Sequence, residues 1–561
     1  MKRIFQLVLP GLLLSQAGWA QYLIEDSILL KTPDGATLSV MVVRKNAAKE
    51  PLPAVLYFTI YTNPTRYLKE AKLVAERGYV SVTAEARGKR LSSATIVPYE
   101  QETRDVNVVI DWISKQPWCN GSVGMYGGSY VGFAQWAATK YLHPALKTIV
   151  PYVAAIPGQG LPMENNIFLN ANYQWAFYVT HNKYLDTAVN NDWQRWKRMR
   201  DNWFSTGVAY GSIDSIDGEP NPLLQRWLQH PAYDAYWQAM VPYKEDFARI
   251  NIPVLTIEGY YDDGQISGLH YMREHCKYNR NATHYLIIGP YDHFGTQTGG
   301  RAVLRDYKVD AVALIDTREI TFQWFDYILK GGSKPAILQD KVNYEVMGAN
   351  EWKHAPSLEK MSDTTLTFYL SNNHLVNKKP ARKSAALQVV DLADRGNFNN
   401  DYYPDPIIRK QLRRKTGLYY ISEPFDKPIV VNGAFYGKLR AVINKKDMNI
   451  GVTLYEVTPD GQYFELSYFL GCASYAKDPT RRQLLQPGRE EDIPFTETRL
   501  VSRQLSKGSR LLVMLDIDKN PFAEINYGTG KDVSQETIAD AGEPLQIHWK
   551  NNSYICVPIA R

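Results

Sequence analysis

Between about residues 22 and 153 the chain alternates short apolar runs with segments of helical periodicity. Apolar runs of this length between turn residues are typical of buried strands, and apolar residues spaced three and four apart indicate a helix that faces a core. The pattern predicts strands at residues 54–58, 79–84 and 123–126 and a helix over residues 103–114. Such alternation predicts a mostly parallel sheet with helices on both faces.

The strand pattern stops between residues 155 and 246, where six of the thirteen tryptophans fall at roughly helical spacing. They are Trp175, Trp193, Trp196, Trp203, Trp227 and Trp237. We interpret this stretch as a helical cap over the sheet edge; most of these rings would form its core, and one or two would shape an apolar pocket. Strands resume at residues 252–258 and 284–289, and a helix over residues 319–329 closes the α/β unit.

Beyond residue 341 the pattern becomes one of strands alone. Candidate strands lie at residues 364–370, 439–443, 450–457, 464–469 and 510–517, with turn residues such as Pro459-Asp460-Gly461 between them. Several short strands separated by turns predict a β-sandwich or jelly roll.

The N-terminus reads as a secretory signal peptide. Lys2 and Arg3 precede an apolar run over residues 4–14, and Ala17-Gly18-Trp19-Ala20 supplies small residues for cleavage before Gln21. The run is too short to span a bilayer, and the rest of the sequence has no long apolar segment. We therefore expect a soluble exported protein, secreted or periplasmic.

Length and charge set further bounds. A chain of 561 residues predicts two or three domains, and a formal charge of +6 is small for this size. The local basic run consists of Arg409, Lys410, Arg413, Arg414 and Lys415. We interpret it as a solvated loop rather than a nucleic-acid site.

The four cysteines, Cys119, Cys276, Cys472 and Cys556, lack the spacing of metal ligands. An oxidising compartment permits a disulfide, for which Cys472 and Cys556 are the more plausible pair because both fall in the C-terminal part. Four unpaired buried thiols are an equal alternative. His270, Glu274 and His275 are wrongly spaced for a single helical face, so we predict no metal site.

The run from Ser122 to Gly132 predicts a strand, a glycine-tightened corner and a helix, with Ser129 at the corner. A serine in such a sharp turn presents its hydroxyl at the carboxyl edge of a sheet. The helix that follows leaves free N–H groups, and the N–H of Tyr130 is placed to stabilise an oxyanion. Val131 stands where the nucleophile-elbow pattern G-x-S-x-G ends in glycine, and Gly132 follows it.

A serine nucleophile needs a base and an acid that orients the base. In α/β-hydrolases the three arrive in the order Ser, Asp, His, each after a strand. Asp262 follows the strand that ends at Glu258, and His293 follows the strand that ends at Gly289. The neighbouring Asp263 leaves open, from the residues alone, which carboxylate faces the imidazole.

Several further motifs occur in the same order as in a known family. They are Arg87-Gly88, Glu102-x-x-Asp105, Gln116-Pro117-Trp118, Gln135-Trp136, Gly259-Tyr260-Tyr261-Asp262, Gly289-Pro290-x-x-His293, Trp324-Phe325-Asp326 and Leu329-Lys330-Gly331. With them the chain resembles the Xaa-Pro dipeptidyl-peptidase and cocaine-esterase family, which also holds glutaryl-cephalosporin acylases and α-amino acid ester hydrolases. The resemblance covers nearly all of the mature chain.

The resemblance implies a triad of Ser129, Asp262 and His293, a helical cap and a C-terminal jelly roll. It also implies that Tyr61 donates its hydroxyl to the oxyanion, although Phe58-Thr59-Ile60-Tyr61 replaces the usual Arg-x-Pro-Tyr. Within the family that the chain resembles, the α-amino acid ester hydrolases look as if they capture a substrate ammonium with carboxylates just after the catalytic aspartate. Here Gly264-Gln265 follow Asp263, which argues against recognition of a free α-amine.

We therefore predict an α/β-hydrolase core over residues 21–154 and 247–340, a cap over 155–246 and a β-sandwich over 341–561, after the signal peptide of residues 1–20. The expected function is hydrolysis of a small ester or amide, without a cofactor, by an exported serine hydrolase. One alternative is an Xaa-Pro dipeptidyl-peptidase or α-amino acid ester hydrolase, with an amine anchor in the cap such as Glu164. Another is a glycan-binding protein with an inert core. Homo-oligomerisation stays open, and we expect neither a membrane span nor nucleic acid as a partner.

Overall fold

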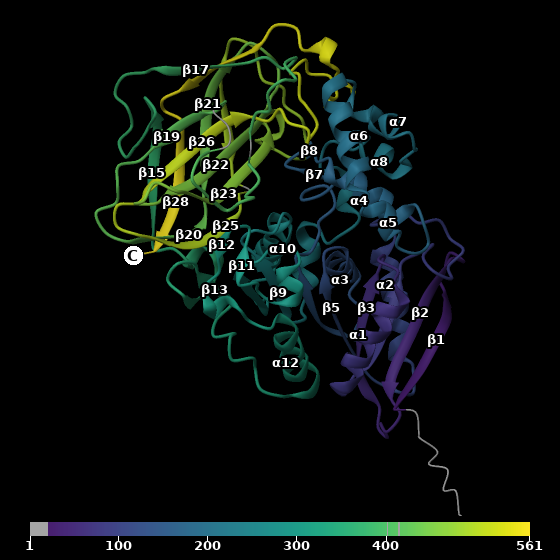
Figure 1. Cartoon of the computed structure of the whole chain (residues 1–561). Helices are drawn as coiled ribbons and strands as arrows, with labels where there is room; N and C mark the ends of the chain where they lie inside the picture. Colours follow the sequence, from purple (N-terminus) through teal and green to yellow (C-terminus); the bar gives the residue numbers. More distant parts are fainter. Residues whose placement is uncertain (1–20, 401, 413–415, 497, 561) are drawn as a thin grey trace, which may run out of the picture.

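Two large β-sheets organise the chain, one in an α/β domain and one in a C-terminal β-rich domain (Figure 1). The computed structural model describes residues 21–560 apart from residues 401, 413–415 and 497. The predicted signal peptide, residues 1–20, therefore lies outside the described residues. The predicted fold class, an α/β core with an inserted helical cap and a C-terminal β domain, is confirmed.

In the part of the chain that the structure describes, the first sheet has ten strands, in the order β1-β2-β4-β3-β5-β6-β9-β10-β13-β14. They are β1 (Tyr22–Lys31), β2 (Thr37–Lys45), β3 (Leu52–Thr59), β4 (Val80–Glu85), β5 (Cys119–Gly128), β6 (Leu146–Tyr152), β9 (Val254–Gly259), β10 (His284–Gly289), β13 (Val342–Val346) and β14 (Glu351–Ala355). The strands from β4 to β13 run parallel. Residues that follow β3, β5, β9 and β10 therefore lie at one edge of the sheet.

Helices cover both faces of this sheet. Helices α1 (Pro64–Glu76) and α12 (Thr317–Lys330) pack on one face, where Val74, Trp324 and Phe325 join an apolar cluster with the strands. Helices α2 (Glu102–Ser114), α3 (Tyr130–Lys140) and α10 (Gln265–Tyr278) pack on the other face. Asp316 caps α12 by accepting a hydrogen bond from the Glu319 N–H, and Gly331 ends the helix with a φ of 72°.

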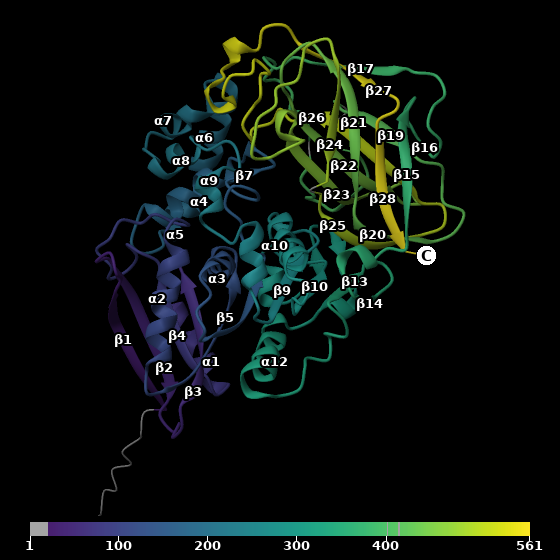
Figure 2. The same ribbon diagram turned by 180° about the vertical axis from the view of Figure 1, so that it is seen from behind.

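The inserted segment folds into short helices that form the cap. Its helices are α4 (Ala171–Thr180), α5 (Thr187–Asn190), α6 (Trp193–Thr206), α7 (Ile213–Asp217), α8 (Pro222–Trp227) and α9 (Ala235–Gln238), after the hairpin of β7 (Met163–Glu164) and β8 (Ile167–Phe168). Seen from both sides, the cap and the C-terminal domain lie next to each other on the same end of the α/β domain (Figure 2). Four of the six cap tryptophans are buried as predicted: Trp196, Trp203, Trp227 and Trp237.

Among the described residues the second sheet has fourteen strands. They are β15 (Thr364–Ser371), β16 (His374–Val376), β17 (Ala385–Val390), β18 (Ile408–Arg409), β19 (Leu418–Ile421), β20 (Ile429–Ala434), β21 (Tyr436–Ile443), β22 (Asn449–Val457), β23 (Tyr463–Cys472), β24 (Glu490–Phe495), β25 (Leu500–Leu505), β26 (Arg510–Ile517), β27 (Leu545–Lys550) and β28 (Tyr554–Ala560). The second sheet begins at Thr364 and not near residue 341. The α/β sheet extends past that point because β13 pairs in parallel with β10, and β14 then pairs with β13.

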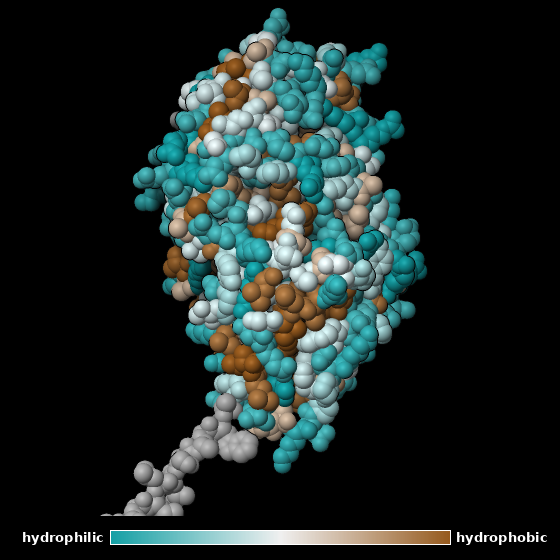
Figure 3. All heavy atoms as spheres, turned by 90° about the vertical axis from the view of Figure 1, so that its right-hand side faces the viewer, coloured by the Kyte–Doolittle hydropathy of each residue, from teal (hydrophilic) through white to brown (hydrophobic). Residues whose placement is uncertain are grey.

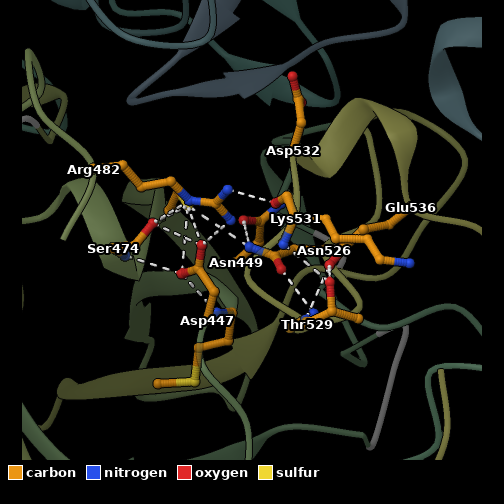
Figure 4. Close-up of polar contacts among 12 residues, drawn as sticks. Asp447, Asn449, Ser474, Arg482, Asn526, Thr529, Lys531, Asp532 and Glu536 are labelled. Carbon is orange, nitrogen blue, oxygen red and sulfur yellow. Dashed lines mark hydrogen bonds and ion pairs between the residues drawn. The ribbon is translucent and has the colours of Figure 1, made fainter. Parts of the chain in front are cut away.

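A long loop of the C-terminal domain, residues 520–541 between β26 and β27, packs against the cap. Glu524 accepts a hydrogen bond from the Phe168 N–H at 3.0 Å, and the Ile538 N–H donates to the Gly207 carbonyl at 2.7 Å. Figure 4 shows how this connection is held: buried Asp447 accepts hydrogen bonds from Arg482 and Ser474, and Arg482 also donates to the Lys531 carbonyl. The loop that contacts the cap is therefore held by a polar network centred on Asp447, just before β22.

One prediction about the C-terminal part needs correction, and one alternative left open by the sequence is decided. Arg409 is not in a solvated loop: it lies in β18, is buried and pairs with Glu465 at 3.0 Å, because a guanidinium drawn into a sheet interface needs a carboxylate partner. Residues 413–415 lie outside the described residues. Cys472 and Cys556 do not form a disulfide: Cys472 contacts Asp447 and Ser474 while Cys556 lies in β28, and all four cysteines are free.

The described part of the chain contains no helix that is long and apolar enough to cross a membrane. Figure 3 shows one face of the molecule, on which hydrophilic side chains predominate and apolar ones gather in separate patches. Exposed apolar side chains of the N-terminal hairpin include Ile24 and Leu29.

A buried ion pair connects the cap segment to the C-terminal domain. Arg499 donates from both terminal nitrogens to Glu164, each at 2.9 Å, and also to the Asp263 carbonyl at 2.7 Å. The side chains of Arg499 and Glu164 are 4% and 2% exposed, so solvent screens the pair little. Burial alone would lower the pKa of Arg499, but the charge of Glu164 outweighs it and the net pKa is raised.

We expect Arg499→Met to destabilise the protein by about 3–5 kcal/mol, because the change leaves Glu164 as an unpaired buried charge. The double variant Arg499→Met with Glu164→Met should recover much of this loss. Thermal and urea unfolding of the full chain measure both effects. Arg77→Gln, which breaks the exposed Arg77–Glu319 pair, is the control and should change stability by about 1 kcal/mol or less. Equal stability of wild type and Arg499→Met would contradict this account.

Candidate active site

Ser129 lies in a strained corner between β5 and α3, with φ of 61° and ψ of −124°. A non-glycine residue with positive φ is costly, and this conformation is the one that exposes a nucleophile between a strand and a helix. The Ser129 N–H donates to the Tyr152 carbonyl at 3.1 Å, and its carbonyl accepts from the Ala155 N–H at 3.3 Å. Both bonds tie the corner to the end of β6.

Gly132 explains the shifted glycine of the elbow. A Cβ at this position would lie 2.9 Å from both Ala154 and the Tyr152 carbonyl, so a larger residue would push α3 away from β6. Val131 is tolerated at the preceding position, where its side chain packs against Gly127. In this chain the position where α3 approaches β6 most closely, which requires glycine, is therefore one residue later than in G-x-S-x-G.

Asp262 is the carboxylate that contacts the imidazole. Its Oδ1 lies 2.7 Å from Nδ1 of His293, and Asp262 is buried. The side chain of Asp263 is instead exposed and lies 3.9 Å from Arg305. The structure therefore separates two neighbouring carboxylates that the residues alone left equivalent.

The loops that carry Ser129 and His293 are in contact. They follow β5 and β10, which lie in the same parallel array with β6 and β9 between them. A Cβ on Gly128 would lie 2.4 Å from the side chain of Gln297, and Gln297 in turn donates to the His293 carbonyl at 2.8 Å. Glycine before the nucleophile thus allows the histidine loop to approach the elbow.

Tyr61 lies beside the nucleophile. Its hydroxyl is 3.4 Å from Ser129 Oγ and accepts a hydrogen bond from Trp175 Nε1 at 3.1 Å. Burial raises the pKa of Tyr61, while its hydrogen bonds with the Ser129 hydroxyl, Trp175 and the Tyr130 backbone act to lower it. The net pKa is above the ordinary value, so the hydroxyl stays protonated at neutral pH and can donate.

Trp175 is the cap residue that the sequence could not single out. It stacks on Tyr99 and Trp227, which hold its ring while Nε1 reaches Tyr61. In the sequence Trp175 is one of six cap tryptophans at similar spacing, and nothing local distinguishes it from the others. Selecting it requires knowing which cap helix faces the sheet edge.

Residues of two other motifs, Arg87-Gly88 and Glu102-x-x-Asp105, form hydrogen bonds that anchor α2 and α3. Arg87 donates to Asp105 at 2.6 and 2.7 Å and to Asp34 at 2.6 and 3.0 Å. The Tyr130 hydroxyl donates to buried Glu102, so the first residue of α3 is anchored to the start of α2. Burial raises the pKa of Glu102 to about 7.

Glu164 is not available as an amine anchor. Its carboxylate is buried and engaged by both terminal nitrogens of Arg499. Gln265, which stands where an acidic residue would favour an ammonium, is buried and exchanges hydrogen bonds with the backbone of Leu500. Among the described residues no group of three or more His, Cys, Asp or Glu side chains could hold a metal ion.

Two family signatures cover most of the chain. The X-Pro dipeptidyl-peptidase (S15 family) signature matches residues 34–295. The signature of the X-Pro dipeptidyl-peptidase C-terminal non-catalytic domain matches residues 338–551. The first spans the α/β sheet from before β2 to the histidine loop, and the second spans most of the β-rich domain.

Full-length relatives exist among characterised proteins and solved structures. Cocaine esterase of Rhodococcus sp. is 24% identical over 580 residues, covering 96% of this chain and 99% of the relative. An aminopeptidase from a marine sediment archaeon, Thaumarchaeota archaeon, has a TM-score of 0.81 at 20% identity, covering 100% of this chain and 99% of that one. An α-amino acid ester hydrolase has a TM-score of 0.79 at 21% identity, covering 96% and 97%. At these identities the structural likeness establishes the fold.

We expect the pKa of His293 to exceed 6.5. Burial of the imidazole acts to lower this pKa. The charge and hydrogen bond of Asp262, with smaller effects of Asp263 and Asp292, raise the pKa by more than burial lowers it. Removing one of these charges in Asp263→Asn should lower the pKa, and Asp201→Asn on the cap should leave it unchanged. Titration of the imidazole by NMR measures all three. A pKa at or below 6.5, or one insensitive to Asp263, would contradict this description.

Proposed function

This chain belongs to the X-Pro dipeptidyl-peptidase and cocaine esterase family of α/β-hydrolases and is a serine hydrolase, and we propose that it cleaves small esters or amides with a triad of Ser129, His293 and Asp262. The observation that carries this proposal is the 2.7 Å contact between Asp262 and His293 at the sheet edge where Ser129 also lies. Tyr61 and the Tyr130 N–H would form the oxyanion hole.

In the proposed mechanism the imidazole works as base and then as acid. Because Nδ1 is engaged by Asp262, Nε2 of His293 takes the Ser129 proton as Oγ bonds to the substrate carbonyl carbon. The carbonyl electron pair moves to oxygen, which receives hydrogen bonds from Tyr61 and the Tyr130 N–H. Collapse breaks the bond to the leaving alcohol or amine, which takes the proton from His293. Water repeats the sequence, releases the acid and restores Ser129.

The polar groups around the site favour substrates without a free α-amine. A substrate ammonium needs a carboxylate partner, since burying an unpaired charge is costly. Glu164 is neutralised by Arg499, and Gln265 provides no charge. An aryl ester or an N-acylated amide has no ammonium group and therefore needs no carboxylate partner.

The second candidate function is that of an exopeptidase. Both family signatures bear the name X-Pro dipeptidyl-peptidase, and Asp263 offers an exposed carboxylate next to Asp262. An α-amine bound by Asp263 would have to compete with Arg305, 3.9 Å away, which is why we place this reading second. The comparisons give no support to a glycan-binding protein with an inert core.

We also propose export to a secreted or periplasmic location. The support is the sequence of residues 1–20: Lys2 and Arg3, an apolar run, and small residues before Gln21.

The direct test of the nucleophile is Ser129→Ala. Loss of the attacking oxygen should lower kcat by roughly 10³- to 10⁶-fold, as for other serine hydrolases. Melting temperature should stay close to that of wild type, because alanine meets the same backbone strain as serine at this φ. Wild-type turnover of an aryl ester by the folded variant would refute the role of Ser129.

A panel of three substrates separates the two candidate functions. A short aryl ester and a glutaryl amide should have kcat/KM values roughly tenfold or more above that of a Gly-Pro anilide, because the free ammonium of the anilide finds no unengaged buried carboxylate. Steady-state kinetics at one pH and ionic strength measure the ratio. A Gly-Pro anilide that is cleaved fastest, with a KM raised by Asp263→Asn, would establish the exopeptidase instead.

A further inference from the structure

A second pocket lies on the face of the sheet that α1 and α12 cover. Its floor is formed by Tyr57 of β3 and by Ser81 and Thr83 of β4. Tyr57 pairs in register with Thr83, so these side chains project from the same face. We name it the tyrosine pocket, after Tyr57, Tyr67, Tyr126 and Tyr152, which line it.

The tyrosine pocket adjoins the nucleophile elbow and is separate from the site around Tyr61. Gly127 and Gly128, the last residues of β5, form part of its wall together with Gln297. Ser129, Tyr61, Trp175 and His293 do not line it. The mechanism proposed above makes no use of this space.

The side chains of the tyrosine pocket are rich in hydrogen-bond donors. Tyr67 is 6% exposed, and its hydroxyl has no hydrogen-bond partner among the described residues. The exposed guanidinium of Arg66 forms no ion pair or side-chain hydrogen bond with any residue that the structure describes. Buried polar groups seldom stay unsatisfied in folded proteins, so the unpaired Tyr67 hydroxyl points to an acceptor in the pocket. The Arg66 guanidinium is free to bind the same acceptor.

The charge of the lining is also positive. Arg66 and Arg318 contribute two guanidinium groups, and Glu70, 3.5 Å from Arg318, is the acidic side chain among the lining residues. One net positive charge favours a monoanion over a dianion, which Glu70 would repel. Arginine recognises a planar carboxylate particularly well, because its fork of N–H groups matches the two oxygens.

The size of the pocket limits the ligand to a small molecule. Its volume is about 70 Å³, and a single water needs roughly 10–15 Å³ measured in this way. The space therefore corresponds to about five waters, or a compound with a similar number of heavy atoms. The rings of the tyrosines supply apolar walls, which a short hydrocarbon tail would cover.

We propose that the tyrosine pocket binds a short-chain carboxylate, with its carboxylate held by Arg66 and Arg318 and its tail against the tyrosine rings. Binding here needs no chemistry at Ser129. It would therefore stand or fall independently of the proposed function.

The test is isothermal titration of the full chain with sodium butyrate, with the uncharged butyramide as the matched ligand at constant ionic strength. Butyrate should bind saturably at one site and butyramide should not. Arg66→Gln and Arg318→Gln should each weaken butyrate roughly tenfold to a hundredfold, the usual effect of one charge-assisted hydrogen bond. Tyr67→Phe should weaken it severalfold.

Two controls distinguish binding in the tyrosine pocket from a general effect of losing an arginine and from binding at Ser129. Arg77→Gln removes another arginine that bridges α1 and α12 through Glu319 but does not line the pocket, and it should bind butyrate like wild type. Protein whose Ser129 has been blocked with a fluorophosphonate should also still bind butyrate. Melting temperatures identify any arginine variant that fails to fold; Tyr67→Phe, which removes one oxygen, then decides the question.

The proposal is overturned by any of four results. These are no butyrate binding by wild type, equal binding of butyramide, unchanged affinity in the folded arginine and Tyr67 variants, and loss of binding when Ser129 is blocked.

Discussion

The corner at Ser129 is the constraint on which the rest of the site depends. A serine held at a φ of 61° is strained, and it persists because β6 on one side and α3 on the other leave the backbone no alternative. Gly132 allows α3 to lie against Tyr152 and Ala154, and Gly128 allows the histidine loop to approach. The same geometry directs Oγ toward Tyr61 and leaves the first N–H groups of α3 beside it.

Two parts of the site next to this corner, the loop that carries Asp262 and the side chain of Tyr61, are held in place by different domains. The loop after β9 is fixed from the C-terminal side: Gln265 exchanges hydrogen bonds with Leu500, and Arg499 donates to the Asp263 carbonyl. Tyr61 is fixed from the cap, through Trp175. A single α/β domain would provide the strand ends but neither of these supports, which gives the β-rich domain and the cap a structural part in the site.

Patterns local in sequence predicted much of this arrangement. Buried parallel strands read as continuous apolar runs, so β3, β4, β5, β9 and β10 were evident, and the residues after them followed from chain order. The strands β1, β2, β6, β13 and β14 were missed. The edge strands β1 and β14 are partly exposed and carry a weaker apolar signal. Exposure does not explain β2, β6 and β13, which are largely buried.

What stayed beyond prediction depends on contacts between distant segments. Glu164 looks like a free carboxylate until Arg499, 335 residues later, is seen to pair with it. Arg409 looks solvated until β18 pairs with β23 and brings it to Glu465. Trp175 looks like any other cap tryptophan until the cap is placed over the sheet. In each case the residue type was informative, but its partner is set by tertiary packing.

The most direct measurement is a crystal structure of the protein after reaction with a fluorophosphonate. The account predicts a covalent bond to Ser129 Oγ, with the phosphonyl oxygen within hydrogen-bond distance of the Tyr61 hydroxyl and the Tyr130 N–H and with His293 still bonded to Asp262. A phosphonyl group on another residue, or one on Ser129 whose oxygen faces neither donor, would contradict it.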